Sequence, residues 1–365
     1  MDRLKALRAD LDDLDAELLA LAARRTALVR DIGALKQASG GALFDRERER
    51  EVLALARSRS QQVGLDPQVG EALMRTLVEG SHLRQQAILC AESSRTLCIV
   101  GGGGRMARRL ARDLIERGHT LRSLEAHEDP DPGDADVVLL AVPMSEQLAV
   151  AARVGPRLKP GALLCDINSL KTEVCSAMAS AWSGEVLGLH PMFGPTVGTL
   201  RRQKVVVCPV RPGPLGLWLQ GELAALGLEL VHCEPEEHDR MMAVVQVLVH
   251  FSTLVMGEAL RRNGVPVQRS LDFTSPIYRL ELAFTGRLFA QSADLYAEIE
   301  MSNPYGGEAR AHFQAAAAEL AELVDRQDRE GFRRLFEGVS DWFGGFEEES
   351  MRLSDVVIDT LVARP

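Results

Sequence analysis

The sequence has 365 residues, which is too long for one typical domain and predicts two or three. Hydrophobic residues make up 46% of it. Its net charge of -10 arises entirely after residue 90. The sequence has no basic tract that would indicate nucleic-acid binding. We find no secretion signal and no apolar run as long as a membrane span, so we expect a cytoplasmic protein without a membrane partner. The six cysteines lack C-x-x-C spacing and are expected to be reduced.

The first predicted element is one long helix over residues 2–38. Its leucine-like positions recur in steps of three and four, as a buried seam between helices requires. Arg25 takes one seam position, and a guanidinium is costly to bury unless an anion meets it. Helices over 45–62, with Asp45 as N-cap, and over 67–90 complete an expected three-helix unit. The other seam residues are Leu4, Leu7, Leu11, Leu14, Leu18, Leu21, Leu28, Ile32 and Leu35.

Spacing along this helix limits which cations can share one ligand. Arg25 and Lys36 lie about 16 Å apart on one stripe, so their long side chains can hold one small anion. Arg8 lies about 25 Å from Arg25 and is rotated by about 100°. If all three cations bind one ligand, Arg8 comes from a second, antiparallel chain, which predicts a homodimer. The alternative is that Arg8 and Lys36 are solvated and that Arg25 only sets the helix register.

Strands alternate with helices after a polar linker at 92–95. The apolar residues 96–100 predict a buried strand, and this alternation is typical of a parallel, doubly wound sheet. Further strands are predicted at 120–125, 136–142, 162–167, 185–189 and 204–208. From about residue 236 the sequence is helical, with periodic windows at 236–263, 268–290 and 305–327. The expected domains are an all-helical unit, a Rossmann-type domain and a second all-helical domain, over 1–91, 95–235 and 236–365.

A glycine-rich turn follows the first predicted strand. It fits G-x-G-x-x-A from Gly102 to Ala107 and opens a helix, so backbone N–H groups would meet a pyrophosphate. Glu125 ends the next predicted strand, where it would accept from the adenosine ribose and repel a 2′-phosphate. We therefore expect NAD and not NADP; the alternative is a glycine-rich turn of another α/β fold. The expected cofactor-binding residues are Gly102, Gly104, Arg105, Met106, Ala107 and Glu125.

Two polar segments follow later strands, where a doubly wound sheet binds its ligands. They are Asp166-Ile-Asn-Ser-Leu-Lys171 and Gly188-Leu-His-Pro-Met-Phe-Gly-Pro195. His190, which precedes a proline in a glycine-rich loop, is the strongest candidate for chemistry, against the alternative of a structural histidine. Arg279 and Arg287 lie eight residues apart on one predicted helical face, and two cations facing a cofactor cleft indicate an anionic substrate.

The motifs of the first unit resemble those of the all-helical chorismate mutases. They are L-x-x-L-R, R-R-x-x-L-V-x-x-I-G-x-x-K, D-R-E-R and S-x-x-x-Q-Q. The resemblance implies a concerted rearrangement of chorismate to prephenate, with Lys36 and Gln85 at the ether oxygen and no nucleophile. Leu43 departs from the family, which often has an aspartate there. Ligand-binding roles are implied for Arg8, Arg25, Lys36, Arg46, Glu47, Ser81 and Gln85.

The later motifs resemble prephenate dehydrogenase. They are G-G-G-G-x-M, D-x-x-S-x-K, G-L-H-P-M-F-G-P, E-H-D, S-P-I-Y-R-L-E-L-A and G-R-L-F-A-Q. Because these motifs follow a mutase unit in the sequence, the chain resembles the bifunctional chorismate mutase/prephenate dehydrogenases over nearly all of residues 1–350. The departures are Ala107 for the usual third glycine and the stretch 303–307. The resemblance implies a homodimer with a C-terminal helical dimerisation domain, a role in tyrosine biosynthesis and feedback inhibition by tyrosine.

The implied second reaction is the NAD-dependent oxidative decarboxylation of prephenate to 4-hydroxyphenylpyruvate. His190 would take the proton of the ring hydroxyl, Ser169 would orient it, and Lys171 would steady the same region. No metal is needed. Two alternatives stay open: a dehydrogenase half that prefers 4-amino-4-deoxyprephenate or arogenate, and a catalytically inactive regulatory protein that keeps the dimeric scaffold. Substrate-binding roles are implied for Arg279, Arg287, His238, His250 and Gln246.

Overall fold

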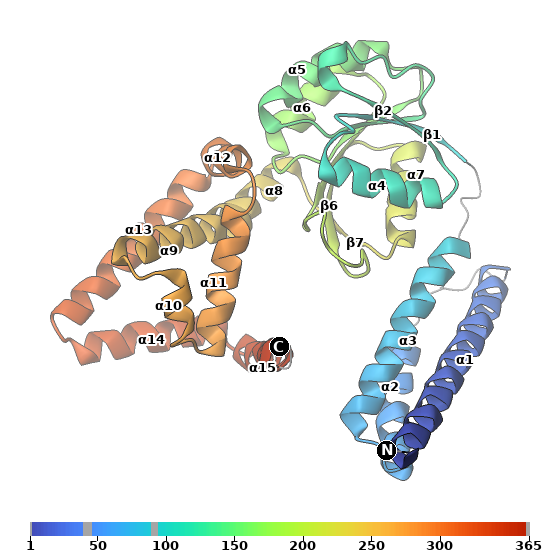
Figure 1. The fold of residues 1–365 in the computed structure, drawn as a ribbon. Coiled ribbons are helices and arrows are strands. Elements are labelled where there is room, and N and C mark those ends of the chain that lie inside the picture. Colours follow the sequence, from blue (N-terminus) through green and yellow to red (C-terminus); the bar gives the residue numbers. More distant parts are fainter. Residues whose placement is uncertain (1, 39–45, 89–93, 363–365) are drawn as a thin grey trace.

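The computed structural model describes residues 2–38, 46–88 and 94–362 (Figure 1). It has three parts in chain order: a helical unit, an α/β domain and a second helical domain. The predicted fold class is therefore confirmed. The five cysteines that the structure describes are free thiols, as expected, and Cys90 lies outside the described residues. Asp45, the predicted N-cap, and Leu43 also lie outside them.

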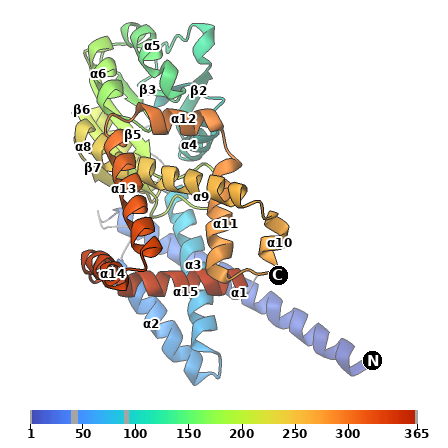
Figure 2. The ribbon, with the colours of Figure 1, turned by 90° about the vertical axis from the view of Figure 1, so that its left-hand side faces the viewer.

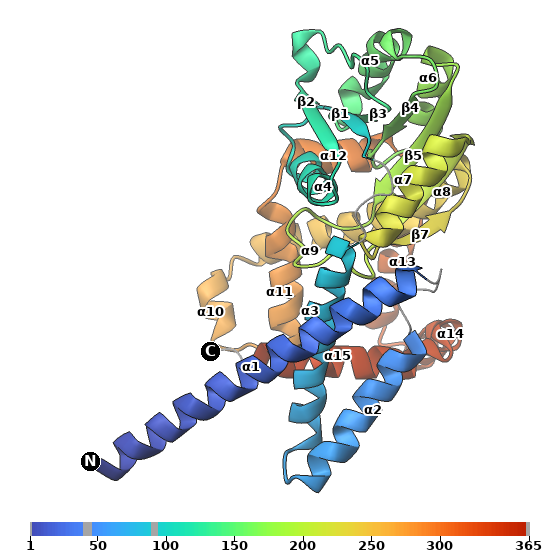
Figure 3. The ribbon, with the colours of Figure 1, turned by 90° about the vertical axis from the view of Figure 1, so that its right-hand side faces the viewer.

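The first unit consists of three helices, α1 (Asp2–Ala38), α2 (Arg46–Gln62) and α3 (Pro67–Ile88). The N-terminal half of α1 projects beyond α2 and α3 (Figures 2 and 3). The expected burial of its seam is wrong for a single chain, because the described seam leucines and isoleucine are between 50% and 65% exposed. A periodic apolar seam of this kind is normally covered by another helix. The exposed seam residues are Leu4, Leu7, Leu11, Leu14, Leu18, Leu21, Leu28 and Ile32.

The α/β domain contains one seven-stranded sheet in the order β2-β1-β3-β4-β5-β6-β7. Only β5 and β6 pair antiparallel; the other neighbours are parallel. Six strands were predicted to within a few residues, and the seventh, which is half-exposed, was missed. The strands are β1 (Thr96–Val100), β2 (Thr120–Leu124), β3 (Val137–Leu140), β4 (Leu163–Asp166), β5 (Glu185–Pro191), β6 (Lys204–Arg211) and β7 (Glu229–His232).

Helices cover both faces of this sheet. Alternate residues of β1 and β3 point to opposite faces and join two separate hydrophobic cores. Helices α5 and α6 pack on one core, and α4 and α7 pack on the other. The parallel strands β1, β3 and β4 therefore end at one sheet edge, where the loops that bind ligands are placed. The helices are α4 (Arg105–Glu116), α5 (Met144–Val154), α6 (Thr172–Ala181) and α7 (Pro214–Ala225).

The C-terminal domain is helical, as predicted. The periodic window 268–290 contains parts of two helices, because Ser275 caps a new helix by accepting from the N–H of Tyr278 at 3.1 Å and Pro276 begins it. The elements are α8 (Pro235–Met242), a π-helical turn (Ala243–Leu248), α9 (Val249–Asn263), α10 (Val267–Leu271), α11 (Pro276–Phe289), α12 (Ala293–Ser302), α13 (Gly306–Asp325), α14 (Arg329–Phe343) and α15 (Phe346–Val362).

One continuous helical segment, Pro235–Asn263, is long and apolar enough to cross a membrane, with a mean hydropathy of 1.6 in its most apolar window. The expectation that no segment meets this criterion is therefore wrong. Only 11% of that window is buried within this chain. His238 and Gln246 of this segment make hydrogen bonds to His190 of the α/β domain.

Candidate active sites

The glycine-rich turn lies between β1 and α4, at the edge where the parallel strands end. Gly101 has a φ of 86°, and a side chain there would meet the carbonyl oxygen of Ala141 at 2.6 Å. A side chain at Gly102 would collide with Ser123 of β2. Gly104 is the N-cap of α4, so free N–H groups of the first helical turn point toward this loop. A pyrophosphate-binding turn requires this close approach of backbone N–H groups.

Glu125 follows β2 directly, and its Oε1 accepts a hydrogen bond from the N–H of Gly103 at 3.1 Å. The carboxylate therefore lies beside the glycine-rich turn, where dinucleotide-binding folds hold the adenosine ribose. Ala107 is buried beneath the turn, Met106 is half-buried, and Arg105 is exposed at the start of α4. The strand order reverses between β1 and β3, which is where such sheets bind dinucleotides. The residues present fit that cofactor.

A buried ion pair connects the end of β4 to the start of α6. The Lys171 ammonium donates to the carboxylate of Asp166, and both side chains are completely buried. Asp166 also accepts from the N–H of Asn168 at 2.8 Å. Ser169 lies in the same loop and is half-buried. Lys171 is therefore held in the core by Asp166, and it fixes the loop that carries Ser169.

Removal of the Asp166 carboxylate tests this ion pair. We expect Asp166→Ala to lower the free energy of unfolding by about 3–5 kcal/mol, because it leaves the Lys171 ammonium buried without a counter-charge. The measurement is urea denaturation followed by tryptophan fluorescence. Asp134→Ala is the matched control, since Asp134 is exposed in the same domain. A loss no larger than that of the control would show that Lys171 is stabilised by other groups.

Four side chains form one hydrogen-bonded chain at the end of β5. His190 Nδ1 lies 2.8 Å from His238 Nε2, and His238 Nδ1 lies 2.8 Å from Asp239 Oδ1. On the other side of the ring, His190 Nε2 lies 3.2 Å from Nε2 of Gln246. His190, His238 and Asp239 are at most 3% exposed. The structure thus joins three residues singled out from the sequence and adds Asp239, which belongs to the E-H-D motif but was assigned no role from the sequence.

Gln246 meets His190 from a π-helical turn, Ala243–Leu248, that continues α8. Such turns are rare in proteins, but many of those that occur lie at functional sites. Helix α8 is held from behind by Asn303, whose Nδ2 donates to the carbonyl oxygen of Asp239 at 2.9 Å. The stretch 303–307, noticed in the sequence as a departure from the family, therefore contributes to positioning α8.

The charges around His190 favour its neutral form. Burial, the neighbouring His238 and the Lys171 ammonium lower the pKa of His190 well below its usual value, and the Asp239 carboxylate opposes them. Burial acts to raise the pKa of Asp239, but hydrogen bonds from His238 and Thr172 outweigh it and hold that pKa below its usual value. At neutral pH, an uncharged imidazole therefore lies at the end of a chain that starts from a carboxylate. Such an imidazole can accept a proton.

Arg287 of α11 reaches the loop after β5, where its Nη2 donates to Thr196 Oγ1 at 3.3 Å. Arg279 lies two turns earlier on α11 and is exposed. Helix α11 can therefore present guanidinium groups toward the loop that carries His190. His250 packs edge-on against Tyr296, with ring centroids 5.0 Å apart, and burial lowers its pKa. Its role in substrate binding stays a prediction.

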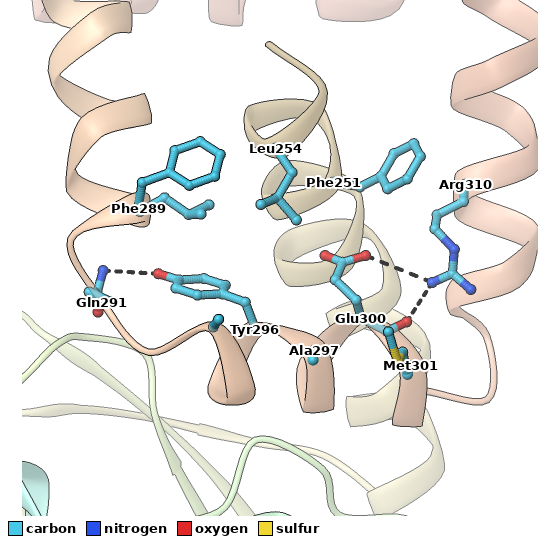
Figure 4. Close-up of a pocket in the computed structure, with 11 residues that line it drawn as sticks. Phe251, Leu254, Phe289, Gln291, Tyr296, Ala297, Glu300, Met301 and Arg310 are labelled. Atoms are coloured by element: carbon cyan, nitrogen blue, oxygen red, sulfur yellow. Dashed lines mark hydrogen bonds and ion pairs between the residues drawn. The ribbon is translucent and has the colours of Figure 1, made fainter. Parts of the chain in front are cut away.

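A cavity of about 500 Å³ opens among α9, α11, α12 and α13 (Figure 4). Its walls are mostly apolar, and the hydroxyl of Tyr296 accepts from Gln291 Nε2 at 2.9 Å on one side. The Glu300 carboxylate is buried 3.8 Å from the Arg310 guanidinium, and burial raises its pKa, which Arg310 opposes. An open apolar cavity of this kind is typical of a surface that another chain covers.

The predicted anion site of the first unit is partly described. Arg25 is half-buried between α1 and α3; its Nη1 donates to the carbonyl oxygen of Leu77 at 3.1 Å, and burial lowers its pKa. Arg8 is exposed on the projecting half of α1. The other candidates belong to these helices, but their side chains lie outside the described residues: Lys36, Arg46, Glu47, Ser81 and Gln85.

A dinucleotide-binding turn and a neutral, buried histidine at one sheet edge define the middle of the chain as part of a dinucleotide-dependent dehydrogenase. Three family models match the chain in order. Residues 7–86 match type II chorismate mutase. Residues 122–214 match the nucleotide-binding domain of prephenate dehydrogenase, and residues 234–338 match its dimerization domain.

Two relatives cover nearly the whole chain. The T-protein of Enterobacter agglomerans is 36% identical over 349 residues, which are 93% of each chain. The T-protein of Haemophilus influenzae is 33% identical over 97% of this chain and 96% of its own. The chain therefore belongs to the T-protein family, and it is an enzyme with a chorismate mutase and an NAD-dependent prephenate dehydrogenase. The resemblance seen in the sequence is confirmed.

A solved structure shows the same fold for the second and third parts. The prephenate dehydrogenase from A. aeolicus in complex with hydroxyphenyl propionate and NAD+ is 19% identical, with a TM-score of 0.54. It covers 69% of this chain and 99% of its own. At this identity the similarity concerns the fold alone.

Proposed function

We propose that His190 is the general base of an oxidative decarboxylation in which prephenate becomes 4-hydroxyphenylpyruvate. The observation that carries this proposal is the buried, neutral imidazole beside the dinucleotide edge of the sheet. His190 takes the proton of the ring hydroxyl, which becomes a carbonyl as the hydride leaves the same carbon. NAD, held by the glycine-rich turn and Glu125, would supply the acceptor for that hydride. The ring carboxylate then leaves as carbon dioxide, its bonding electrons complete the aromatic ring, and the carbonyl oxygen regains a proton as the phenol.

We base the remaining roles on the family resemblance. Ser169 hydrogen-bonds the ring hydroxyl from the loop that the buried Lys171 fixes. Arg287 binds a substrate carboxylate, since it already reaches the loop that follows His190. Arg279 supports it from the same helix.

The first unit supplies prephenate to this site. Its reaction is a concerted shift within one molecule, so the protein has to hold chorismate in a compact conformer and stabilise charge on the ether oxygen. Arginines suit both carboxylates because they are permanently charged and bidentate. We assign Arg8, Arg25 and Arg46 to the carboxylates and Lys36 with Gln85 to the ether oxygen, and we expect Glu47 and Ser81 to bind the ligand as well.

One pair of assays tests the two activities together. With prephenate and NAD, the appearance of NADH absorbance reports the dehydrogenase alone. With chorismate and NAD, the same signal requires both sites, since only the mutase supplies prephenate. Signal with prephenate but none with chorismate would disprove an active mutase, and no signal with either would disprove the dehydrogenase.

A second candidate substrate is 4-amino-4-deoxyprephenate. The dehydrogenase of that name from Streptomyces pristinaespiralis is 28% identical over 70% of this chain. The mutase in front favours prephenate, because it makes that compound. The ratio of kcat/KM for prephenate, for the amino analogue and for arogenate decides among the three.

Glu125 is expected to set cofactor preference. Charged hydrogen bonds are worth about 1.5–3 kcal/mol, so Glu125→Ala should raise the KM for NAD by about 10–100-fold and improve use of NADP relative to NAD. Initial rates with each cofactor provide the measurement. Glu128→Ala is the control, because Glu128 is exposed in the same loop. An unchanged cofactor ratio would remove Glu125 from the ribose site.

We also propose a homodimer in the cytoplasm. The chain exposes 22613 Å², whereas a compact monomer of 39.9 kDa would expose about 14,000 Å². The excess includes the apolar seam of α1 and the cavity of the helical domain, both of which suit a second copy. Light scattering should give twice the chain mass.

Tyrosine, whose phenol and carboxylate resemble those of the product, is expected to inhibit by competing with prephenate.

A further inference from the structure

We propose that Asp239 and His238 are positioning residues that fix the tautomer of His190 and keep its Nε2 unprotonated, so that it can accept the substrate proton. This inference rests on the proposed role of His190 as the base. It concerns two residues that are buried on the Nδ1 side of His190, across the ring from Gln246.

The donor and acceptor of each hydrogen bond can be assigned by starting from Asp239. Its Oδ1 accepts from the N–H of Lys171 at 2.8 Å, and its Oδ2 accepts from the N–H of Thr172 at 2.9 Å. These N–H groups belong to the N-terminus of α6, which favours an anion. An ionised carboxylate only accepts, so His238 donates to Asp239 from Nδ1.

The remaining protons follow from this first assignment. A neutral His238 that carries its proton on Nδ1 has an unprotonated Nε2, which accepts. His190 therefore carries its proton on Nδ1 and donates to His238 over 2.8 Å. His190 Nε2 is then an acceptor, and it faces Gln246 Nε2, an amide donor, at 3.2 Å. The amide of Gln246 marks the position from which a hydroxyl would approach.

The hydrogen-bonded series of Asp239, His238 and His190 also stabilises the charge that proton uptake creates. When His190 accepts a proton on Nε2, the resulting imidazolium still donates from Nδ1 to His238, and Asp239 lies one ring further on. The Lys171 ammonium acts against this charge, but it is paired with Asp166. The arrangement has the logic of the aspartate–histidine pair of the serine hydrolases, with a second histidine between carboxylate and base.

A matched pair of variants separates this role from simple packing. His238→Gln can still accept from His190 and donate to Asp239, whereas His238→Leu can do neither. We expect His238→Leu to lower the kcat for prephenate oxidation at least about 100-fold with little change in KM, and His238→Gln to lose less than about tenfold. Equal losses in both variants, or no loss in His238→Leu, would overturn the proposal.

The pH profile of Asp239→Asn gives a second test. The Asp239 carboxylate acts to raise the pKa of His190, against burial and the Lys171 ammonium. Its removal should move the acid limb of kcat/KM to lower pH and reduce kcat at least about 100-fold. Glu237→Gln, which removes an exposed charge from the same helix, should change neither. A limb that stays in place would contradict the proposal.

A third test uses the wild-type enzyme, so it does not depend on whether a variant folds. Nitrogen-15 NMR of histidine-labelled protein should show His190 protonated on Nδ1 and unprotonated on Nε2 at neutral pH. The opposite tautomer would overturn the proposal whatever the variants do. If wild-type enzyme formed no NADH from prephenate while this tautomer was present, the proposed function would fail and the hydrogen-bonded chain would stand.

Discussion

Replacement of His190 by asparagine is expected to lower kcat for NADH formation from prephenate by about 10²–10⁴-fold. Asparagine is smaller than histidine but can still donate and accept hydrogen bonds within the pocket. It cannot take up a proton at neutral pH, so the loss reports proton transfer. The measurement is the steady-state rate at saturating prephenate and NAD, in the full-length protein.

Two controls accompany this variant. His127→Asn, at an exposed position of the same domain, should retain the full rate. The mutase rate of His190→Asn should also be unchanged, because that site lies in a different domain. If the dehydrogenase rate stayed within a few-fold of wild type, another group would have to accept the proton.

The pH dependence should carry the same signature. A general base works only when it is unprotonated, so kcat/KM falls as the pH drops through the pKa of His190 in the free enzyme. Because burial, His238 and Lys171 lower that pKa, the acid limb should lie well below the usual histidine value of about 6.5. The limb should be absent in His190→Asn. A limb at the usual value would mean that water reaches the imidazole freely.

The parts of the fold predicted correctly are those in which burial dictates the sequence pattern. The strand over 96–100 is an apolar run because both faces of the sheet are covered. The strand Glu229–His232 was missed because it is short and only half-buried at the sheet edge. The break before Pro276 was present in the sequence as a Ser-Pro helix start, but helical periodicity continued on both sides and hid it.

The candidate dehydrogenase site also combines residues that the sequence indicates with residues that only the fold brings together. His190 stood out because a local motif surrounds it. The function of Asp239 depends on α8 lying against the N-terminus of α6, and the N–H of Lys171 that it accepts from is 68 residues away. No local spacing encodes that contact. The seam of α1 shows the converse: its periodicity predicts burial, but its described leucines and isoleucine are exposed in a single chain.

The second large effect is expected in the mutase. Arg25→Ala should lower the rate of chorismate conversion by about 10²–10³-fold or more, because it removes a charged donor from a half-buried site. Arg24→Ala is a closely matched control, since Arg24 is exposed at the neighbouring position of the same helix. The dehydrogenase rate with added prephenate should be unchanged in both. An intact mutase rate in Arg25→Ala would show that the helical anion site is misassigned.

A mixture of two inactive variants tests whether the mutase site is shared between chains. Arg8 and Arg25 are about 25 Å apart along α1, so one chain cannot bring both to a small ligand. In a heterodimer of Arg8→Ala and Arg25→Ala chains, one of the two sites keeps Arg25 from one chain and Arg8 from the other. Random re-association makes half of the dimers mixed, so mutase activity should return to about a quarter of wild type. No recovery after subunit exchange would place both arginines in sites built from a single chain. An Arg8→Ala variant that is active before mixing would leave Arg8 outside the site.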